Sequence, residues 1–292
     1  MTASSSVTVG VHLPQAGPAA SGEALRQAAV LAEQLGFRDV WLSDHLLVPT
    51  GADYPPSAYV LEPLASMAWV AAATGTVRIG TSILVLPMRH PVEVAKSLAT
   101  TDQLSGGRVV LGTAAGWLET EFDALGVPFH ERGARMDEAL EMLRTLWTED
   151  HITRTFPVHG AEFTSMRAKP QPVGHLPIWI GGHGKAAIQR AITFGDGWHG
   201  AFLGPEQTKR IVSSLRLARP DPNFVISMRT SWDPMADNHD QILSEFDAYR
   251  EAGVTHLVPE PRQRTLADYL RSIESLSELM KRGGASLQLP ES

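Results

Sequence analysis

Residues 177–187 read PIWIGGHGKAA, and this stretch is the best guide to the architecture of the chain. A short apolar strand pattern runs directly into three glycines, and a helix pattern begins at Ala186. Glycine lacks a Cβ, so the backbone can approach a ligand closely, and the free N–H groups of a helix start favour a phosphate. We therefore expect a phosphate-bearing cofactor here, with Lys185 as an added cation. The alternative is a turn that needs glycine only for its geometry.

The same order of strand and helix extends along the whole chain. The predicted strands cover residues 7–13, 39–43, 77–86, 108–113, 178–180, 195–200, 224–229 and 255–258. Apolar residues at i, i+3 and i+4 predict the helices, which cover residues 22–35, 62–73, 91–104, 132–147, a segment from 186, 205–217, 239–252 and 266–282. Residues 151–173 contain several prolines and are predicted to leave the core.

Eight strand–helix units predict a parallel sheet with right-handed crossovers. The 292 residues suit an α/β fold of the (β/α)8 TIM-barrel type, which takes about 250 residues, with an insertion between units four and five. A doubly wound open sheet is the rival, but no break in composition separates two halves. We expect one domain over residues 7–285 and a disordered tail at residues 1–6.

Composition limits the partners and the compartment. The net charge of −7 argues against nucleic acid and anionic membrane surfaces. There is no cysteine, which removes disulfides and thiolate sites and agrees with a cytoplasmic location. The start of the chain lacks the pattern of a signal peptide. The longest apolar run, residues 64–73, is shorter than the roughly 20 residues that a membrane span needs.

In a barrel the working residues lie at the carboxyl ends of the strands. The sequence places small and polar residues there: His12, Ser43, Asp44, His45, Thr81, Ser82, Ile83, Thr113, Ala114, Ala115, Gly116, Trp117, His183, Trp198 and His199. The small residues leave room for a flat ligand across the barrel mouth. Tight packing of strand against helix would also explain them.

Other chemistries fit this sequence less well. A metal-dependent hydrolase would need clustered ligands, but there is no His-x-His pair, and Asp44 and His45 are adjacent and would point to opposite faces of a strand. We predict no metal site. Residues 182–187 read G-x-G-x-x-A, but no acid ends the next strand, as a dinucleotide site would require. Ala186 after Lys185 also departs from a P-loop.

Several segments together resemble the bacterial luciferase-like superfamily, and most of all its F420-dependent oxidoreductase branch. The resemblance spans about residues 7–200 and is carried by residues 39–45, 78–87, 91–96, 101–108, 112–122, 125–129, 131–133, 177–184 and 195–198. It implies a (β/α)8 barrel, a homodimer, and a flavin or deazaflavin in the barrel mouth. It also implies a bulge at the end of strand three with a cis peptide bond between Ser82 and Ile83, behind the ring of the cofactor.

The resemblance further implies which residues meet the cofactor and the substrate. The cofactor residues are Asp44, Ser82, Ile83, Val85, Ala114, Ala115, Gly116, Trp117, Gly181, Gly182, His183, Gly184 and Lys185. We expect His45 to donate or accept the proton at the reacting centre, because histidine titrates near neutrality, and Asp44 to orient it or bind the ring. His183 and His199 are second candidates for substrate contact.

The expected function is hydride transfer between coenzyme F420 and a small organic substrate. The alternatives are an FMN-dependent monooxygenase and a flavin-binding barrel without activity. One residue departs from the branch, because its sugar-phosphate dehydrogenases carry glutamate where Trp117 stands. The resemblance therefore does not imply a sugar phosphate, and Trp117 would give the substrate an apolar or stacking wall.

Overall fold

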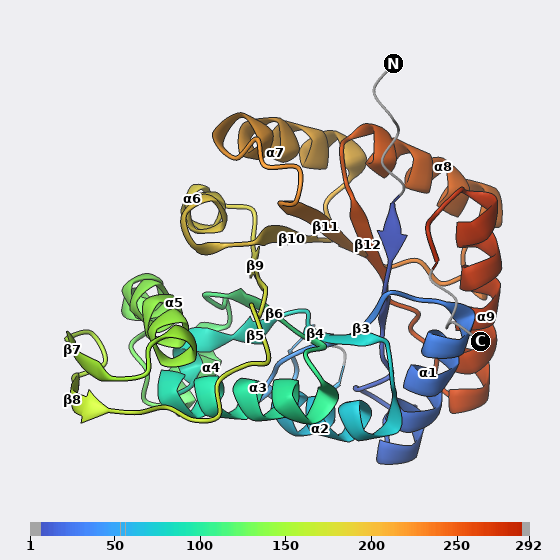
Figure 1. Ribbon diagram of the computed structural model, residues 1–292. Coiled ribbons are helices and arrows are strands. Elements are labelled where there is room, and N and C mark those ends of the chain that lie inside the picture. The colour runs from blue at the N-terminus through green and yellow to red at the C-terminus, as the bar shows by residue number, and fades with distance from the viewer. Residues whose placement is uncertain (1–6, 53, 56, 288–292) are drawn as a thin grey trace.

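The computed structural model describes residues 7–52, 54–55 and 57–287, so the predicted tail at residues 1–6 lies outside the described residues. Parallel strands form one barrel with the helices outside it (Figure 1). The strands are β1 (Thr8–Val9), β2 (Val11–His12), β3 (Asp39–Leu42), β4 (Arg78–Thr81), β5 (Leu84–Val85), β6 (Val109–Ala114), β9 (Ile178–Gly181), β10 (Gly197–Ala201), β11 (Val225–Thr230) and β12 (His256–Pro259).

The barrel closes at the first strand. β1 pairs with β12 and β2 pairs with β3, and only Gly10 separates β1 from β2. The predicted strand at residues 7–13 is thus one barrel strand that changes partner at Gly10. The predicted third strand is likewise divided, into β4 and β5, at the peptide bond between Ser82 and Ile83. The fold confirms the predicted TIM barrel.

The helices follow the predicted order. They are α1 (Gly22–Leu35), α2 (Pro63–Ala73), α3 (Pro91–Ser105), α5 (Arg132–Thr148), α6 (Lys185–Phe194), α7 (Pro205–Ala218), α8 (His239–Glu251) and α9 (Leu266–Arg282). The short helix α4 (Glu119–Ala124) and the turns η1 (Leu86–Met88) and η2 (Phe129–Glu131) were not predicted, because so few residues show no period. Within the described ranges, no helix has the length and apolar character needed to cross a membrane.

The predicted excursion is an antiparallel hairpin. β7 (Ile152–Phe156) pairs with β8 (Ala161–Met166), and Figure 1 shows the pair beyond α5, away from the barrel strands. The hairpin inserts between β6 and β9, which confirms an insertion between units four and five.

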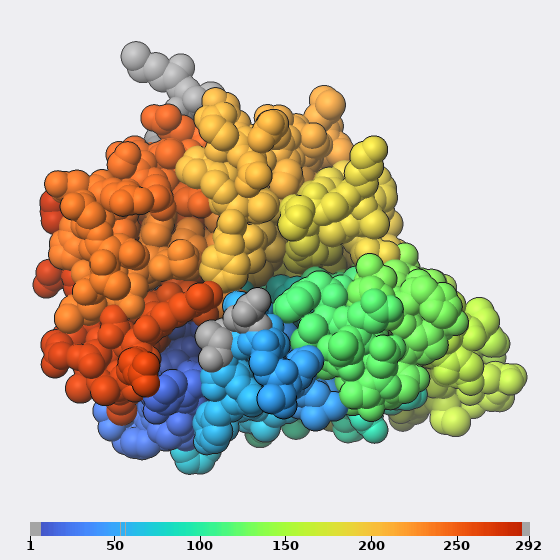
Figure 2. All heavy atoms as spheres, turned by 180° about the vertical axis from the view of Figure 1, so that it is seen from behind, coloured from blue at the N-terminus to red at the C-terminus, as the bar shows by residue number. Residues whose placement is uncertain are grey.

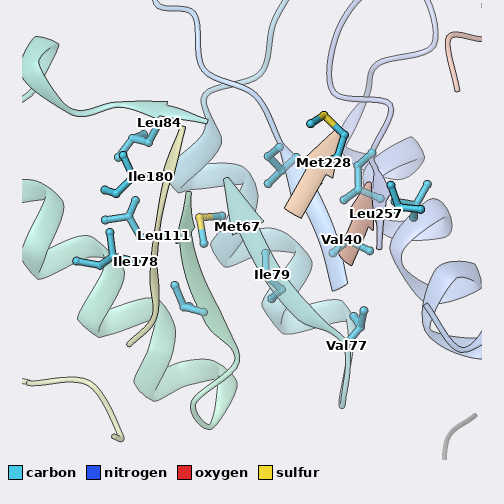
Figure 3. Packing of buried hydrophobic residues seen from close by; sticks show 14 of the residues in the cluster. Val40, Met67, Val77, Ile79, Leu84, Leu111, Ile178, Ile180, Met228 and Leu257 are labelled. Atoms are coloured by element: carbon cyan, nitrogen blue, oxygen red, sulfur yellow. The ribbon is translucent and has the colours of Figure 1, made fainter. Parts of the chain in front are cut away.

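Alternate residues of each strand face two different cores. Outward side chains such as Val40, Ile79 and Ile178 pack in the main cluster between strands and helices (Figure 3). The inward-facing Trp41 and Trp179 instead meet inside the barrel, with ring centroids 5.0 Å apart. Because these indoles fill the barrel interior, the open space at its mouth has a floor.

Candidate active site

A cavity of about 880 Å³ opens at the carboxyl ends of the barrel strands. In Figure 2 it corresponds to the hollow between the green segment around α5 and the yellow segment around α6. Its volume falls in the range of small-molecule sites. The lining consists mostly of small and aromatic residues, with a few charged ones: Ser43, Asp44, His45, Tyr54, Ser82, Ile83, Val85, Ala114, Ala115, Gly116, Trp117, His130, Arg132, Gly133, Gly181, Gly182, His183, Gly184, Ala186, Ala187, Arg190, His199, Ala201, Phe202 and Arg229.

The structure brings the residues proposed from the sequence together in this lining, with one difference. Lys185 begins α6 and is exposed, but it is not among the lining residues. Arg132 lines the cavity instead, at the start of α5. The sequence analysis did not single out Arg132, because only the fold brings the start of α5 beside the start of α6.

The floor of the cavity is built from small side chains around Ile83. The peptide bond between Ser82 and Ile83 is cis, which confirms the feature that the resemblance implied. A Cβ on Gly181 would lie 3.1 Å from Ile83 Cγ2 and 3.3 Å from Ala114 Cβ. The bare backbone of Gly181 therefore leaves a flat apolar surface, against which a planar ring system fits.

The glycine turn opens into the same cavity. Gly182 has a φ of 104°, which favours glycine, and its carbonyl accepts a hydrogen bond of 2.7 Å from Trp198 Nε1. Gly184 is the N-cap of α6, no side chain caps the helix there, and a Cβ at this position would meet open space. The first N–H groups of α6 are thus available to an anion, as a phosphate tail requires.

The carboxylate of Asp44 is held away from His45. Asp44 accepts a hydrogen bond of 2.9 Å from the N–H of Val85 and pairs with Arg89 Nη2 at 2.7 Å. Burial raises the pKa of the Asp44 carboxyl, while Arg89 favours its ionised form. Asp44 therefore anchors β5 and the turn that follows it. Of the two roles expected from the sequence, its side chain is not seen to orient His45, and contact with the cofactor ring stays a prediction, since Asp44 lines the cavity.

The partner of His45 is Glu121, which comes from α4. Glu121 Oε2 lies 3.3 Å from His45 Nδ1, and Glu121 Oε1 accepts hydrogen bonds from the N–H groups of Leu46 and Leu47 at 2.5 and 3.0 Å. Burial opposes ionisation of this carboxyl, but the hydrogen bonds from His45, Leu47 and Leu46 prevail and lower its pKa. The sequence offered Glu121 only as part of a matched segment, because its role depends on the unpredicted helix α4.

A second group of polar residues supports the floor from below. Arg229 Nη1 donates to Ser43 Oγ at 2.9 Å and to the carbonyl of Ser82 at 2.5 Å, and Arg229 Nη2 pairs with Glu260 at 2.8 Å. Burial opposes ionisation of Glu260, yet Arg229 and other cations nearby lower its pKa to about 2. Neither Arg229 nor Glu260 was proposed from the sequence.

Two buried histidines complete this group. His12 Nε2 lies 2.8 Å from Ser43 Oγ, and His199 Nε2 lies 2.7 Å from Ser82 Oγ. Burial, followed by nearby positive groups, lowers the pKa of each imidazole to about 3, so both rings are neutral at physiological pH. In the described part of the chain, no group of three or more His, Asp or Glu side chains is placed to hold a metal ion.

Comparison with known protein families agrees with the fold and the cavity. The family model of the luciferase-like monooxygenases matches residues 3–289. The chain belongs to the luciferase-like monooxygenase family. It is an oxidoreductase of the luciferase-like class, which confirms the resemblance seen in the sequence.

Curated relatives match part of the chain. An F420-dependent glucose-6-phosphate dehydrogenase of Kineococcus radiotolerans is 36% identical over 60% of this chain and 51% of its own length. An uncharacterised protein of Mycobacterium tuberculosis is 30% identical over 66% of this chain and 70% of its own length. The match thus spans between half and about 70% of these relatives.

Two solved structures share the whole fold. A monooxygenase from Streptomyces bottropensis superposes with a TM-score of 0.78 at 21% identity, and an F420-dependent secondary alcohol dehydrogenase with a TM-score of 0.77 at 21% identity. Both comparisons cover 94% of this chain and 99% of the other. At this identity the likeness shows the barrel fold alone and leaves the cofactor open.

Proposed function

We propose that this luciferase-like protein uses coenzyme F420 to transfer hydride to or from a small organic substrate. The observation that carries the proposal is the 36% identity to an F420-dependent dehydrogenase over 60% of the chain. The cavity supports it, because it combines a flat apolar floor with an open helix N-terminus.

The residues present fit a phosphorylated cofactor with a tricyclic ring. Ile83, Gly181 and Ala114 form the surface for the ring, since the missing Cβ of Gly181 lets the other two side chains pack closely against its backbone. The turn at residues 182–184 and Arg132 would hold the phosphate, because both line the cavity and both favour an anion. Reduced FMN carries a ring and a phosphate too, so it is the alternative that the experiment must separate.

The chain's own residues supply the proton chemistry. When bound, F420 would be the group that accepts or donates the hydride. Glu121 accepts the Nδ1–H of His45 in this arrangement, which leaves Nε2 as the nitrogen that can take or give a proton in the cavity. Glu121 is the positioning residue, and His45 is the proposed catalytic residue.

Equilibrium titration of the purified protein tests the proposal. Oxidised and reduced F420 and FMN would each be added to the apo protein, with binding followed by the absorption and fluorescence of the cofactor. We expect F420 to bind at least about tenfold more tightly than FMN, a difference of about 1.4 kcal/mol. Tight binding of FMN without F420 would overturn the proposal in favour of a flavin monooxygenase, and binding of neither would overturn both. The expected homodimer stays a prediction, which analytical ultracentrifugation can check.

A further inference from the structure

Three aromatic rings from separate segments meet in the lining of the cavity. His45 follows β3, Tyr54 lies in the loop beyond it, and Trp117 lies between β6 and α4. The ring centroids are 6.1 Å apart for His45 and Tyr54, 6.4 Å for His45 and Trp117, and 6.1 Å for Tyr54 and Trp117. We call these three residues the aromatic cage. Trp117 is 57% exposed, so the cage presents ring surface that the described residues leave uncovered.

The aromatic cage borders the proposed reacting centre. It contains His45, whose Nε2 has no hydrogen-bond partner among the residues that the structure describes, whereas the proposed cofactor contacts lie on Gly181, Ile83 and the start of α6. A substrate that gives its proton to His45 must therefore lie against Tyr54 or Trp117. This step rests on the proposed function.

The charges in the lining disfavour an anionic substrate. Arg190 Nε pairs with Asp137 at 2.6 Å, and Arg229 Nη2 pairs with Glu260 at 2.8 Å. A negative group bound at Arg229 would have to displace Glu260 or lie beside it. Arg132 is the cation proposed for the cofactor phosphate. A substrate anion would thus lose its hydration without gaining a free partner.

The same charges disfavour a cation, although aromatic rings can bind cations. Asp44 is the acid in the lining, and Arg89 pairs with it at 2.7 Å. Arg229 and Arg262 both lie over the ring of Phe202, at 5.2 and 5.5 Å from its centroid. Glu260 pairs with Arg229 at 2.8 Å and with Arg262 at 3.0 Å. Among the residues that the structure describes, the lining therefore offers a positive substrate no carboxylate that is not already paired with an arginine.

We propose that the aromatic cage binds an uncharged substrate through a flat apolar face, such as an aryl group, and that Trp117 determines this choice. The substrate lies on the rings of Trp117 and Tyr54, and its reacting oxygen faces His45 Nε2. A phosphorylated sugar is excluded, because its charge finds no unpaired cation in the cage.

Three probes with one shared core test the charge preference. Acetophenone is uncharged, 4-acetylbenzoate carries a negative group on the same ring, and (4-acetylphenyl)trimethylammonium carries a positive one. Each would be titrated calorimetrically into the protein loaded with oxidised F420. We expect acetophenone to bind at least about tenfold more tightly than either charged probe.

Variants of two comparable tryptophans test the role of the cage. Trp117→Ala is expected to weaken acetophenone binding about tenfold, and Trp117→Phe to restore most of it, because the aromatic contact is kept. Trp69→Ala is the matched control, since Trp69 is 51% exposed on α2 and lies outside the cavity lining. It should leave acetophenone binding unchanged. Circular dichroism would verify that each variant is folded.

The cofactor affinity, measured on the same samples, separates the two proposals. Suppose that F420 binds normally. The cage proposal is then overturned if a charged probe binds as tightly as acetophenone or more tightly, if acetophenone does not bind, or if Trp117→Ala has no effect. The proposed function stands in each of these cases. If only FMN binds, the titrations are made on the FMN-loaded protein, where a preference for acetophenone supports the cage while the F420 proposal fails. If neither cofactor binds, both proposals fail.

Discussion

Glu121 holds His45 through both of its carboxylate oxygens: Oε2 lies 3.3 Å from His45 Nδ1, and Oε1 accepts the N–H groups of Leu46 and Leu47. The ring and the backbone that carries it are thus fixed by one side chain. This side chain comes from α4, a short helix inserted between β6 and the long helix α5. A carboxylate on Nδ1 sets the tautomer of an imidazole, so α4 determines which nitrogen of His45 serves the cavity.

Removal of the Glu121 carboxylate should loosen this segment and release the ring. In Glu121→Ala we expect hydrogen exchange at the amides of Leu46 and Leu47 to accelerate about tenfold or more, because hydrogen bonds to a charged acceptor are lost. The ¹⁵N spectrum of His45 should change from mainly Nδ1–H to a mixture of tautomers. Glu119→Ala is the control, since Glu119 is exposed on the same helix. Unchanged exchange at Leu46 and Leu47 would show that Glu121 does not position His45.

Arg132 should contribute to affinity only for a phosphorylated cofactor. Its guanidinium lies 3.8 Å from the centroid of the Phe129 ring, and it lines the cavity from the start of α5. Arg132→Gln is expected to weaken F420 binding about tenfold, because a charge-assisted hydrogen bond to phosphate is lost. Binding of the dephosphorylated deazaflavin chromophore should not change. An equal loss for both ligands in a fluorescence titration would contradict a role at the phosphate.

Gly182 should be irreplaceable in the turn before α6. Its φ of 104° is unfavourable for other residues, and a Cβ would lie 2.9 Å from the Cβ of Ala187. We expect Gly182→Ala to lower the melting temperature and to weaken F420 binding. Gly75→Ala is a fair comparison, because a Cβ there meets nothing within 4 Å and should change neither quantity. Wild-type cofactor affinity in a folded Gly182→Ala protein would argue against the turn as the phosphate site.

Local patterns predicted the elements of the barrel well. Apolar residues at helical spacing and the glycine after Leu35 predicted α1 to the residue, and Gly36 has the left-handed φ of 87° that a C-cap needs. Pro91 is the first residue of α3, as its fixed φ suggested. Such signals are readable because each depends on a few neighbouring residues.

The parts that the sequence did not reveal depend on contacts between distant segments. Arg229 and Ser82 are 147 positions apart, and Glu121 and His45 are 76 apart, so neither pair leaves a local pattern. Asp44 was expected to orient His45 or to bind the cofactor ring; its carboxylate binds Arg89 from the next unit, and contact with the ring stays a prediction. The local sequence identified the segment that contains Asp44 and His45, but the partner of each side chain depends on contacts with residues that are distant in the sequence.

The buried imidazoles should make stability fall in mild acid. His12 and His199 have folded-state pKa values of about 3, against 6.5 for the free side chain, so the unfolded chain binds more protons between these values. Their contribution is fully present above about pH 6.5 and is lost as the pH falls toward 3. Each group contributes a limiting slope of about 1.4 kcal/mol per pH unit.

Denaturant unfolding at several pH values checks whether the free energy of unfolding falls as the pH is lowered. His199→Asn keeps a polar side chain but removes one titrating group, so the free energy of unfolding should depend less steeply on pH between 6 and 4, by about 1 kcal/mol per unit. His130→Asn is the control, because His130 is 84% exposed and should leave the slope unchanged. If His199→Asn kept the wild-type slope, His199 would already be protonated or exposed in the folded protein. That result would contradict a hydrogen bond between the neutral imidazole of His199, through Nε2, and Ser82 Oγ, on which the cavity floor depends.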